Sequence, residues 1–306
     1  MKNNGYSRRK FVKATTCLAG TAMVGSVFPM EAFGGNGTNG NVVLSGHLWI
    51  YASRFPPDWD CTPILEQVFD DFAYSGMQGV EIMESMLRRP ESISYLKELA
   101  DKYGIPVTGC SYYGDMWDRS QHVELVEDIE LVVENLHKLN AKTFGITVGD
   151  AGHKKTESEL DAQADLVRKI IAICEKNDVE ANLHNHNFEV ENNLHDFKGT
   201  IERVPEIKLG PDVSWLVRAG VDPVWFIRTY GERMVYLHLR DQHHDGKWTR
   251  ALGEGITDFP AIARELKKVG FKGRAAIELA AEDNVVTAVR EDWKKSRDYV
   301  QNVFGW

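Results

Sequence analysis

The chain has 306 residues, of which 43% are hydrophobic and 26% are charged, and its formal net charge is −9. This length suits one large domain or two small ones, and the composition excludes a coiled coil, a collagen or a largely disordered chain. The acidic balance argues against nucleic acid and against anionic membranes as partners.

The first 32 residues have the character of an export signal. Ser7-Arg8-Arg9-Lys10-Phe11 resembles a twin-arginine signal, and a weakly apolar stretch rich in small residues follows over 14–28. We expect cleavage near Ala32, a Gly/Asn-rich linker over 33–41, and a periplasmic or otherwise exported domain over 42–306. The twin-arginine export machinery would then be a partner. Because the apolar stretch is short, we expect no stable membrane insertion after processing, with an uncleaved anchor as the alternative.

Removal of this signal would make the protein more acidic. Residues 1–32 contain five basic residues and one acidic residue, so the net charge would fall from −9 to −13. Of the four cysteines, Cys17 lies in the signal, and the other three are far apart without C-x-x-C spacing. We therefore predict buried thiols, with a Cys61–Cys110 disulfide as the minor alternative.

From residue 42 onward, short apolar runs alternate with longer amphipathic stretches. We expect strands at Val43–Tyr51, Gly79–Met83, Pro106–Tyr112, Thr143–Val148, Val179–His184, Ile207–Asp212, Met234–Leu239 and Arg274–Leu279. We expect helices at Pro63–Ser75, Ser92–Tyr103, Gln121–Leu139, Ser158–Lys176, Asp196–Arg203, Pro223–Tyr230, Phe259–Val269 and Val285–Val303. Eight such β-then-α units predict a single-domain (β/α)8 barrel. No G-x-G-x-x-G follows the first strand, which disfavours a dinucleotide-binding fold.

Side chains that can bind a metal lie at or just beyond the C-terminal ends of several expected strands. They are Glu81 and Glu84 on the second strand, His184 and His186 on the fifth, Asp212 on the sixth, His238 and Asp241 on the seventh, and Glu278 on the eighth. The active sites of such barrels lie at the C-terminal ends of the strands, so these side chains should converge. Alternate strand residues share a face, so His184 and His186 should point the same way. The set could fill the shell of one divalent ion and leave positions open for a substrate.

Three stretches resemble the xylose isomerase-like barrel superfamily, also called the sugar phosphate isomerase/epimerase family. They are Pro211–Trp215, with the sequence PDVSW; Val235–Asp241, with VYLHLRD; and Leu252–Gly255, with LGEG. The stretch Ala181–Glu189, ANLHNHNFE, is similar to a sub-branch of the same superfamily.

The resemblance implies one divalent ion (Mn2+, Co2+, Mg2+ or Zn2+) held by His184, Asp212, His238 and Glu278. Most members of the family have a glutamate where this chain has His184, and in those enzymes two carboxylates move protons on opposite faces of the substrate. The histidine here argues against such a symmetrical epimerisation. The sequence leaves open whether His184 or His186 is the ligand from the fifth strand.

The chemistry that this resemblance implies is removal of a proton beside the carbonyl of a sugar or keto-glycoside, leading to isomerisation, epimerisation or β-elimination. A divalent ion would stabilise the negative charge that forms as the proton leaves. Glu278 is the candidate base. His186 could act as base or acid because the ordinary pKa of histidine lies near neutrality, and Glu81 is a second acid/base or hydroxyl-binding candidate.

The candidate substrate contacts are Trp215, Arg240 and Glu254, and each has a structural alternative. Trp215 could be core, Arg240 could form a surface salt bridge, and Glu254 could only shape its loop. Asp212 could cap the turn that follows it, and Glu189 could orient one of the imidazoles.

Other function classes remain open. An endonuclease IV-like phosphodiesterase shares the barrel and some motifs, but it needs histidines just before Leu-Gly-Glu-Gly, where this chain has Trp248-Thr249-Arg250-Ala251. A metal-dependent hydrolase and a non-catalytic carbohydrate-binding barrel are further alternatives. Export and the lack of an obvious Lys/Arg cluster favour an unphosphorylated small carbohydrate as the substrate, and the sequence does not decide whether the chain forms a homo-oligomer.

Overall fold

The computed structural model of the chain describes residues 42–280 and 289–306. The predicted signal and linker lie outside the described residues, as does the first part of the last predicted helix, residues 285–288. No described helix has the length and apolarity that crossing a membrane would require.

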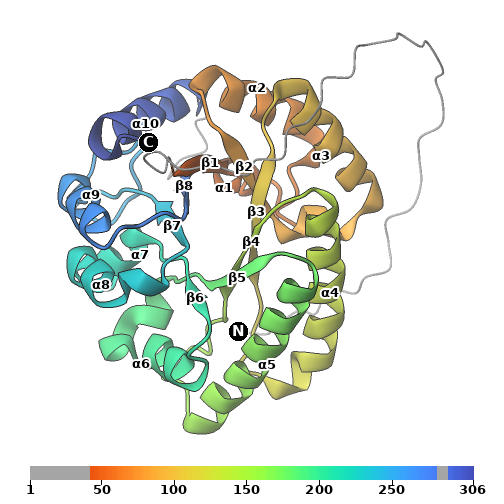
Figure 1. Cartoon of the computed structure of the whole chain (residues 1–306), viewed down its shortest axis with the longest axis vertical. Coiled ribbons are helices and arrows are strands. Elements are labelled where there is room, and N and C mark those ends of the chain that lie inside the picture. Colours follow the sequence, from red (N-terminus) through yellow and green to blue (C-terminus); the bar gives the residue numbers. More distant parts are fainter. Residues whose placement is uncertain (1–41, 281–288) are drawn as a thin grey trace. The chain divides into compact units, whose positions relative to one another are not determined.

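Eight parallel strands form one sheet in the order β6-β5-β4-β3-β2-β1-β8-β7. The strands are β1 (Val43–His47), β2 (Gly79–Met83), β3 (Val107–Tyr113), β4 (Thr143–Thr147), β5 (Glu180–Leu183), β6 (Lys208–Leu209), β7 (Tyr236–Leu239) and β8 (Arg274–Glu278). Isolated parallel bridges Leu209–Met234 and Asp212–His238 join the two end strands, β6 and β7. The sheet therefore closes into a barrel, and the prediction of a (β/α)8 fold is confirmed (Figure 1).

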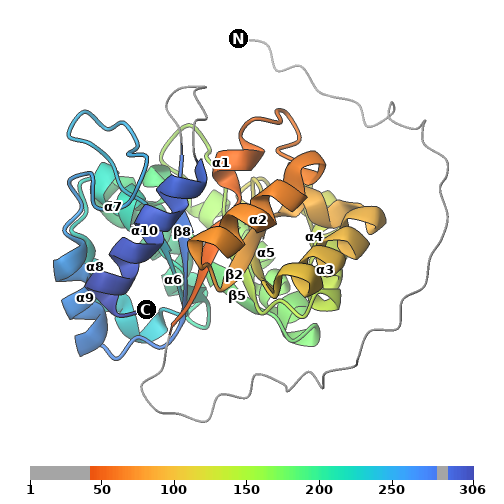
Figure 2. The ribbon, with the colours of Figure 1, turned by 90° about the horizontal axis from the view of Figure 1, so that it is seen from above.

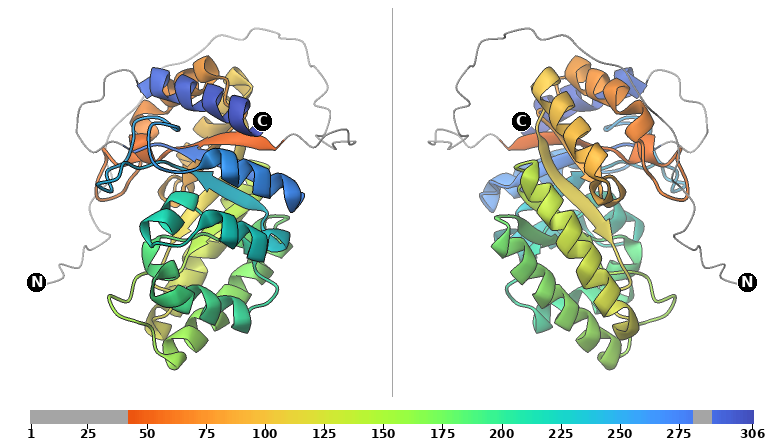
Figure 3. Two further views of the ribbon diagram at one scale, coloured as in Figure 1. Left: turned by 90° about the vertical axis from the view of Figure 1, so that its left-hand side faces the viewer. Right: turned by 90° about the vertical axis from the view of Figure 1, so that its right-hand side faces the viewer.

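Helices surround the strands (Figure 1). The longer ones are α2 (Leu65–Ser75), α3 (Pro90–Tyr103), α4 (His122–Lys138), α5 (Glu157–Lys176), α6 (Asn187–Arg203), α8 (Pro223–Tyr230), α9 (Phe259–Lys268) and α10 (Val289–Phe304). Shorter elements in the connections are α1 (Trp49–Ala52), α7 (Val213–Arg218) and the 3-10 turns η1 (Thr62–Ile64), η2 (Glu84–Arg88), η3 (Arg119–Gln121) and η4 (Gly231–Arg233). The last helix, α10, packs beside α2, the first long helix (Figures 1 and 3).

The hydrophobic core lies between the sheet and the helices. Outward-facing strand residues such as Leu44, Ile82 and Phe144 are fully buried in it. Alternate strand positions point into the barrel, and several of these are polar. In the strand register, His47 pairs with Glu81 on one side and with Glu278 on the other, so three polar residues lie at one level of the barrel.

The cysteines of the described region, Cys61, Cys110 and Cys174, are buried free thiols. The predicted buried thiols are thus confirmed, and the alternative Cys61–Cys110 disulfide does not form. Burial raises the pKa of the Cys61 and Cys174 thiols to about 12, so both remain protonated at neutral pH.

Two element boundaries differ from the prediction at positions that matter for the site. The first strand ends at His47 rather than continuing to Tyr51, because the chain turns into α1 at Trp49. Helix α6 begins at Asn187, well before the predicted Asp196, but its backbone leaves the helical conformation over residues 191–194. The short helix α7, which follows Asp212, was not predicted.

Candidate active site

Predicted metal-binding residues from three adjacent strands come together in the barrel. His184, Asp212 and His238 each offer one ligand atom, and these three atoms lie within 4.8 Å of one another, with all three residues buried. The described part of the chain holds no second group of this kind, so it shows nothing like a three-metal cluster. His184 and Asp212 follow β5 and β6, and His238 is the next-to-last residue of β7, which places all three at the C-terminal end of the barrel.

Asp212 uses its two carboxylate oxygens differently. Oδ1 accepts hydrogen bonds from the backbone N–H groups of Ser214 (2.8 Å) and Trp215 (3.2 Å) and so caps α7. Oδ2 is buried and has no hydrogen-bond partner. Burial, together with the charge of Glu278, raises the pKa of Asp212 to about 6. The capping role therefore exists, and it leaves one buried oxygen that suits a cation.

The backbone around Asp212 is held by Asn185, the middle residue of the His-Asn-His stretch. The Asn185 side chain accepts from the Asp212 N–H at 3.3 Å and donates to the Asp212 carbonyl at 3.4 Å. Asn185 thus fixes β5 to β6 at the level of the cluster. Sequence reasoning treated only the flanking histidines, although an asparagine between two converging side chains was the available signal.

The two histidines that follow β5 have different surroundings. His184 is 6% exposed, and burial, with His238 and His186 nearby, holds the pKa of its imidazole well below 6.5. A neutral imidazole is the form that binds a metal. His186 lies farther out with its side chain 31% exposed, and its ring is 5.4 Å from that of His184. Burial lowers the pKa of His186 to about 4, so near neutral pH this ring can accept a proton but not donate one as an imidazolium.

Glu278 lies beside the cluster as part of a buried ion pair. Its Oε1 accepts from Arg240 Nη1 at 2.8 Å, and its Oε2 lies 3.2 Å from His238 Nδ1 and 3.6 Å from His47 Nδ1. Burial alone would raise the pKa of Glu278, but Arg240, His47 and His238 hold it well below 4.5. Glu278 is therefore an ionised carboxylate fixed by positive and polar neighbours, and its assignment as the fourth metal ligand remains a prediction.

Glu81 lies behind His238. Its Oε2 accepts from the Tyr236 hydroxyl at 2.8 Å and lies 2.8 Å from His238 Nε2. Although burial opposes the charge, the carboxylates of Glu81 and Glu278 hold the pKa of His238 well above 6.5. The ring therefore carries a proton on each nitrogen, and it would have to release one of them to bind a metal ion. A carboxylate on the second nitrogen of a ligating histidine fixes the ring's orientation, which is the role that this geometry supports for Glu81.

Aromatic and guanidinium groups form a wall beside Glu278. Arg240 is only 4% exposed, and its guanidinium carbon lies 3.6 Å from the centre of the Trp248 ring, so the surface salt bridge considered from the sequence does not form. Arg218 lies over the same ring at 3.7 Å. Trp215 is half-buried and contacts both Trp248 and His186, with ring centres 4.9 and 5.1 Å apart. Trp215 thus extends this wall to His186.

Two acidic residues of the loop between β7 and α9 organise that loop. Asp241 accepts hydrogen bonds from four backbone N–H groups, those of Gln242, Gly253, Gly255 and Thr257. Glu254 accepts from the Ala251 N–H at 3.1 Å and pairs with Lys295 of α10. The structure does not bring Glu254 to the metal-binding group, and its contacts favour the loop-shaping alternative. Figure 2 shows this loop and α1 projecting from the same side of the barrel.

His47 was missed from the sequence. Its Nε2 is 2.8 Å from the Ser111 hydroxyl, and its ring centre is 5.3 Å from that of His238. The predicted first strand ran to Tyr51 and placed His47 in the middle of a strand. Had the strand been ended at His47, the residue would have been recognised as one more polar group at a strand end.

Comparisons with known proteins agree with the barrel fold. The family model described as a xylose isomerase-like TIM barrel matches residues 69–303. The inosose dehydratase of Geobacillus kaustophilus is 22% identical over 273 residues, covering 78% of this chain and 87% of the dehydratase.

Solved structures share the fold at lower identity. The D-allulose 3-epimerase of Methylomonas sp., in complex with D-allulose, aligns with a TM-score of 0.72 at 15% identity, over 86% of this chain and 97% of the epimerase. The 3-keto-D-glucoside 4-epimerase of E. coli aligns with a TM-score of 0.67 at 15% identity, over 87% of this chain and all of that protein. The chain is thus similar to sugar isomerase/epimerase-like enzymes and to a dehydratase.

Proposed function

The chain belongs to the xylose isomerase-like TIM barrel family, and from this premise we propose that it is a divalent-metal-dependent enzyme that removes a proton beside the carbonyl of an unphosphorylated keto-sugar or keto-glycoside. One observation carries the proposal. One carboxylate oxygen of Asp212 lies within 4.8 Å of a ring nitrogen of His184 and of His238. The same carboxylate has a buried oxygen without a hydrogen-bond partner, and Glu278 beside the group is held ionised.

The residues fit a single divalent ion. His184, Asp212 and His238 would hold Mn2+, Co2+, Mg2+ or Zn2+, with Glu278 as the fourth ligand. Asp212 Oδ2 is anionic and buried without a donor, which is costly unless a cation or a hydrogen bond compensates it. Such an ion would supply Lewis-acid stabilisation of negative charge on a sugar oxygen.

We propose Glu278 as the base, acting through an oxygen that substrate binding leaves free. Arg240 occupies Oε1, while Oε2 faces His238 and His47. The ionised carboxylate is thus held in one orientation, with a fixed guanidinium and a histidine beside it. Because Glu278 is buried, water is excluded and the interactions that orient the carboxylate are strong.

A second carboxylate placed to act on the opposite face is not evident among the described residues. The fifth-strand position holds His184, a neutral imidazole, and Glu81 is fixed between His238 and Tyr236. His186, neutral and partly exposed, is a further proton acceptor at the mouth. This asymmetry supports one-base chemistry, either isomerisation or β-elimination, over mirror-image epimerisation. The similarity to an inosose dehydratase supports the eliminating alternative.

The test is turnover of candidate keto-sugars by the purified protein with its metal content measured. The panel would contain methyl 3-keto-glucoside, D-allulose and an inosose, each assayed before chelation, after chelation and after adding back Mn2+ or Co2+. We expect about one bound ion per chain and activity that is lost and restored with the metal. NMR identification of the product separates an isomerase from a lyase. Full activity of metal-free protein would refute the proposal.

We also propose export by the twin-arginine route, on the basis of Arg8-Arg9 and the apolar stretch after them. Replacing both arginines by lysine should retain the full-length protein in the cytoplasm of the producing cell. The measurement is the fraction of processed protein in the periplasm, with a Lys2→Arg variant as the matched control. Unchanged export of the double variant would contradict this assignment.

A further inference from the structure

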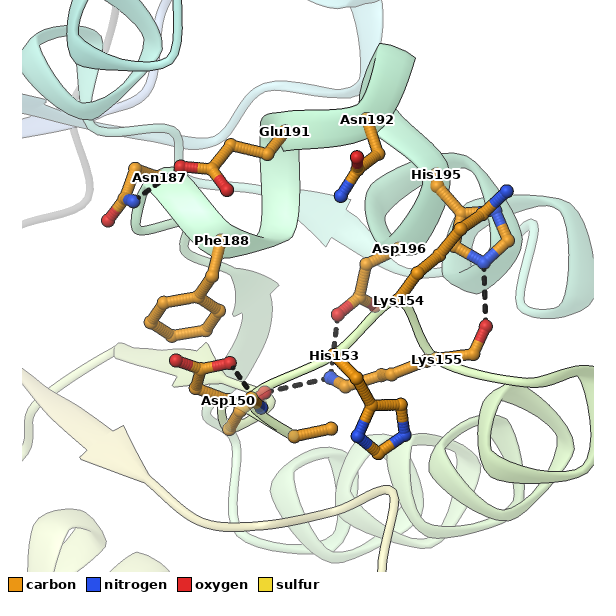
Figure 4. A pocket seen from close by; sticks show the side chains of 13 residues that line it. Asp150, His153, Lys154, Lys155, Asn187, Phe188, Glu191, Asn192, His195 and Asp196 are labelled. Atoms are coloured by element: carbon orange, nitrogen blue, oxygen red, sulfur yellow. Dashed lines mark hydrogen bonds and ion pairs between the residues drawn. The ribbon is translucent and has the colours of Figure 1, made fainter.

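We propose that a cavity beside the barrel mouth binds the second ring of a glycoside, so that the substrate is a keto-disaccharide or similar glycoside rather than a free monosaccharide. This inference rests on the proposed function and specifies the substrate class of the same site. The cavity, called here the side pocket, has a volume of about 330 Å3 and is lined by residues 149–155, 187–188, 191–192 and 195–196 (Figure 4). That volume lies at the lower end of the range for small-molecule sites, which suits one sugar ring.

The side pocket belongs to the same end of the barrel as the candidate active site. Residues 149–155 follow β4, and Asn187 and Phe188 come directly after the His184–His186 stretch that follows β5. The ring of Phe188 lines the pocket, and it is stacked on His186 at 5.4 Å with an angle of 14° between the rings. His186 in turn contacts the ring of His184. The Phe188–His186 ring pair therefore lies between the pocket and His184 of the proposed metal site.

The deep side of the pocket is rigid and electrically neutral. The ammonium group of Lys155 is buried and donates its three hydrogen bonds to Asp196 (2.6 Å), Gln163 (2.7 Å) and the Gly149 carbonyl (2.8 Å). Gln163 donates in turn to Asp196 and Thr200. Lys155 therefore has no donor left for a phosphate or a substrate carboxylate, and the network fixes the pocket in shape.

The remaining lining suits hydroxyl groups. Asp150 Oδ1 accepts from the Gly152 N–H, and Glu191 Oε1 accepts from Asn187 Nδ2 at 2.6 Å. Among the described residues, no donor meets the second oxygen of either carboxylate. Figure 4 shows Asp150 beside the Phe188 ring, and Glu191 and Asn187 near each other on α6. Carboxylate and amide groups next to an aromatic ring suit the hydroxyl groups of a sugar. Lys154 and His153 also line the pocket, so its lining carries groups of both charge signs.

The backbone of the pocket is strained on the same side. Asn192, Asn193 and Leu194 have φ values of 52°, 60° and 61°, three consecutive residues in the left-handed region. Asparagine tolerates this region, but a bulky residue such as Leu194 rarely adopts it. This interruption of α6 brings Glu191 and Asn192 to the pocket. Strain of this kind is typical of functional segments.

The test compares two substrates that differ only in the second ring. The probes are 3-keto-cellobiose, oxidised on its non-reducing ring, and methyl 3-keto-β-glucoside, together with the α-linked pair 3-keto-maltose and methyl 3-keto-α-glucoside. The wild type should prefer the disaccharide of at least one linkage by about tenfold in kcat/KM. The variant D150N/E191Q should lose this preference while turning over the methyl glycoside within about twofold of wild type. The matched control is E157Q/D161N on the outer face of α5, where both carboxylates pair with Arg203; it should keep the preference.

Failure of the pocket and failure of the proposed function are distinguishable. Binding of the same probes is measured by calorimetry on the Glu278→Gln protein and on Glu278→Gln combined with D150N/E191Q. If no probe reacts with the wild type, yet the disaccharide binds more tightly and the pocket substitutions abolish that difference, the proposed chemistry is wrong and the pocket stands. If the probes react but the disaccharide preference is absent, or is unchanged in D150N/E191Q, the pocket assignment is overturned. Absence of both binding and reaction overturns both.

Discussion

The two halves of the barrel mouth differ in how their carboxylates are satisfied. On the β5–β6 side, Asp212 Oδ2 is buried without a hydrogen-bond partner, as are Asn182 Oδ1 and His186 Nδ1, whereas Arg240 Nε is such an atom on the other side. On the side formed by β7, β8, β1 and β2, the carboxylates of Glu278 and Glu81 are both paired with donors from neighbouring strands. His238 lies between the two halves, since it belongs to the metal-binding group and contacts both carboxylates.

This difference indicates that the two halves have different functions. A buried polar atom without a partner costs about 1–3 kcal/mol, which is tolerated where a bound ion or substrate supplies the missing interaction. The unsatisfied half is therefore suited to binding, while the satisfied half holds the base in a fixed orientation before the substrate arrives. Substitutions on the two sides should consequently have different signatures.

The largest effect is expected from Asp212→Asn. The amide oxygen of asparagine can still cap α7, but the side chain loses its negative charge and one of its two oxygens. The protein should therefore lose its metal ion, and turnover should fall by on the order of 10⁴-fold. Metal analysis and a turnover assay measure this change. Asp222→Asn is the matched control, because Asp222 caps α8 through the Val224 N–H. Retention of one ion and near-normal turnover by Asp212→Asn would show that the unsatisfied half is not a metal site.

Glu278→Gln should reduce turnover by about 10³-fold, as expected for removal of a general base. We also expect weaker metal retention, because Glu278 is the predicted fourth ligand. Measuring turnover with saturating metal separates the two contributions. If saturating metal restored the variant to wild-type turnover, Glu278 would be a ligand only and the base would have to be sought elsewhere.

A smaller effect is expected from Arg240→Lys, which keeps the charge beside Glu278 but loses the planar group stacked on Trp248. We expect kcat to fall about 10- to 100-fold while the bound metal remains at one ion per chain. Arg218→Lys is the comparison variant, because Arg218 also lies over Trp248 but has no contact with Glu278 among the described interactions, and it should have a weaker effect on kcat. Loss of metal in Arg240→Lys would show that the two halves of the mouth are not separable.

The smallest effect concerns stability and depends on pH. Burial and the charge of Asp196 raise the pKa of Glu189 to about 8. The backbone N–H groups of Val148 and His186 donate to this carboxylate and lower its pKa, but their effect is smaller. Since the folded-state pKa exceeds the ordinary 4.5, the native state binds the proton more tightly, and this stabilisation is present below about pH 4.5 and lost as the pH rises through about 8.

Glu189→Gln removes this titration. The unfolding free energy of the wild type should therefore exceed that of the variant by a larger margin at pH 5 than at pH 8.5, with a change of about 1 kcal/mol or more. Denaturant unfolding at the two pH values is the measurement. A margin that grows with pH would show that the two backbone donors keep Glu189 ionised.

Much of this arrangement could be predicted from the sequence, because hydrophobic periodicity records strand and helix order directly. The alternation of apolar runs and amphipathic stretches was sufficient for the barrel, and the polar residue ending each run located His184, Asp212 and His238. What periodicity cannot record is the partner of a buried side chain. The pairing of Glu278 with Arg240, or of Glu81 with His238, joins residues on different strands and depends on register and side-chain packing.

Short elements were also beyond the sequence. Helices α1 and α7 are four and six residues long, too short for a periodic signal, and α1 is the reason that β1 ends at His47. The left-handed run Asn192–Leu194 interrupts α6 without a glycine or proline to mark it. The side pocket depends on that run, so no sequence pattern pointed to it.

The most direct test of the central claim is proton NMR of methyl 3-keto-glucoside after reaction in deuterated water with the Mn2+-loaded protein. The protein is removed before the spectra are recorded. The account predicts that wild type replaces the proton on the carbon beside the carbonyl, seen as deuterium in recovered substrate or as loss of that proton in an unsaturated product. In the presence of Glu278→Gln, this proton should exchange no faster than it does without enzyme. A wild-type product that still carries the original proton on that same carbon would contradict the account.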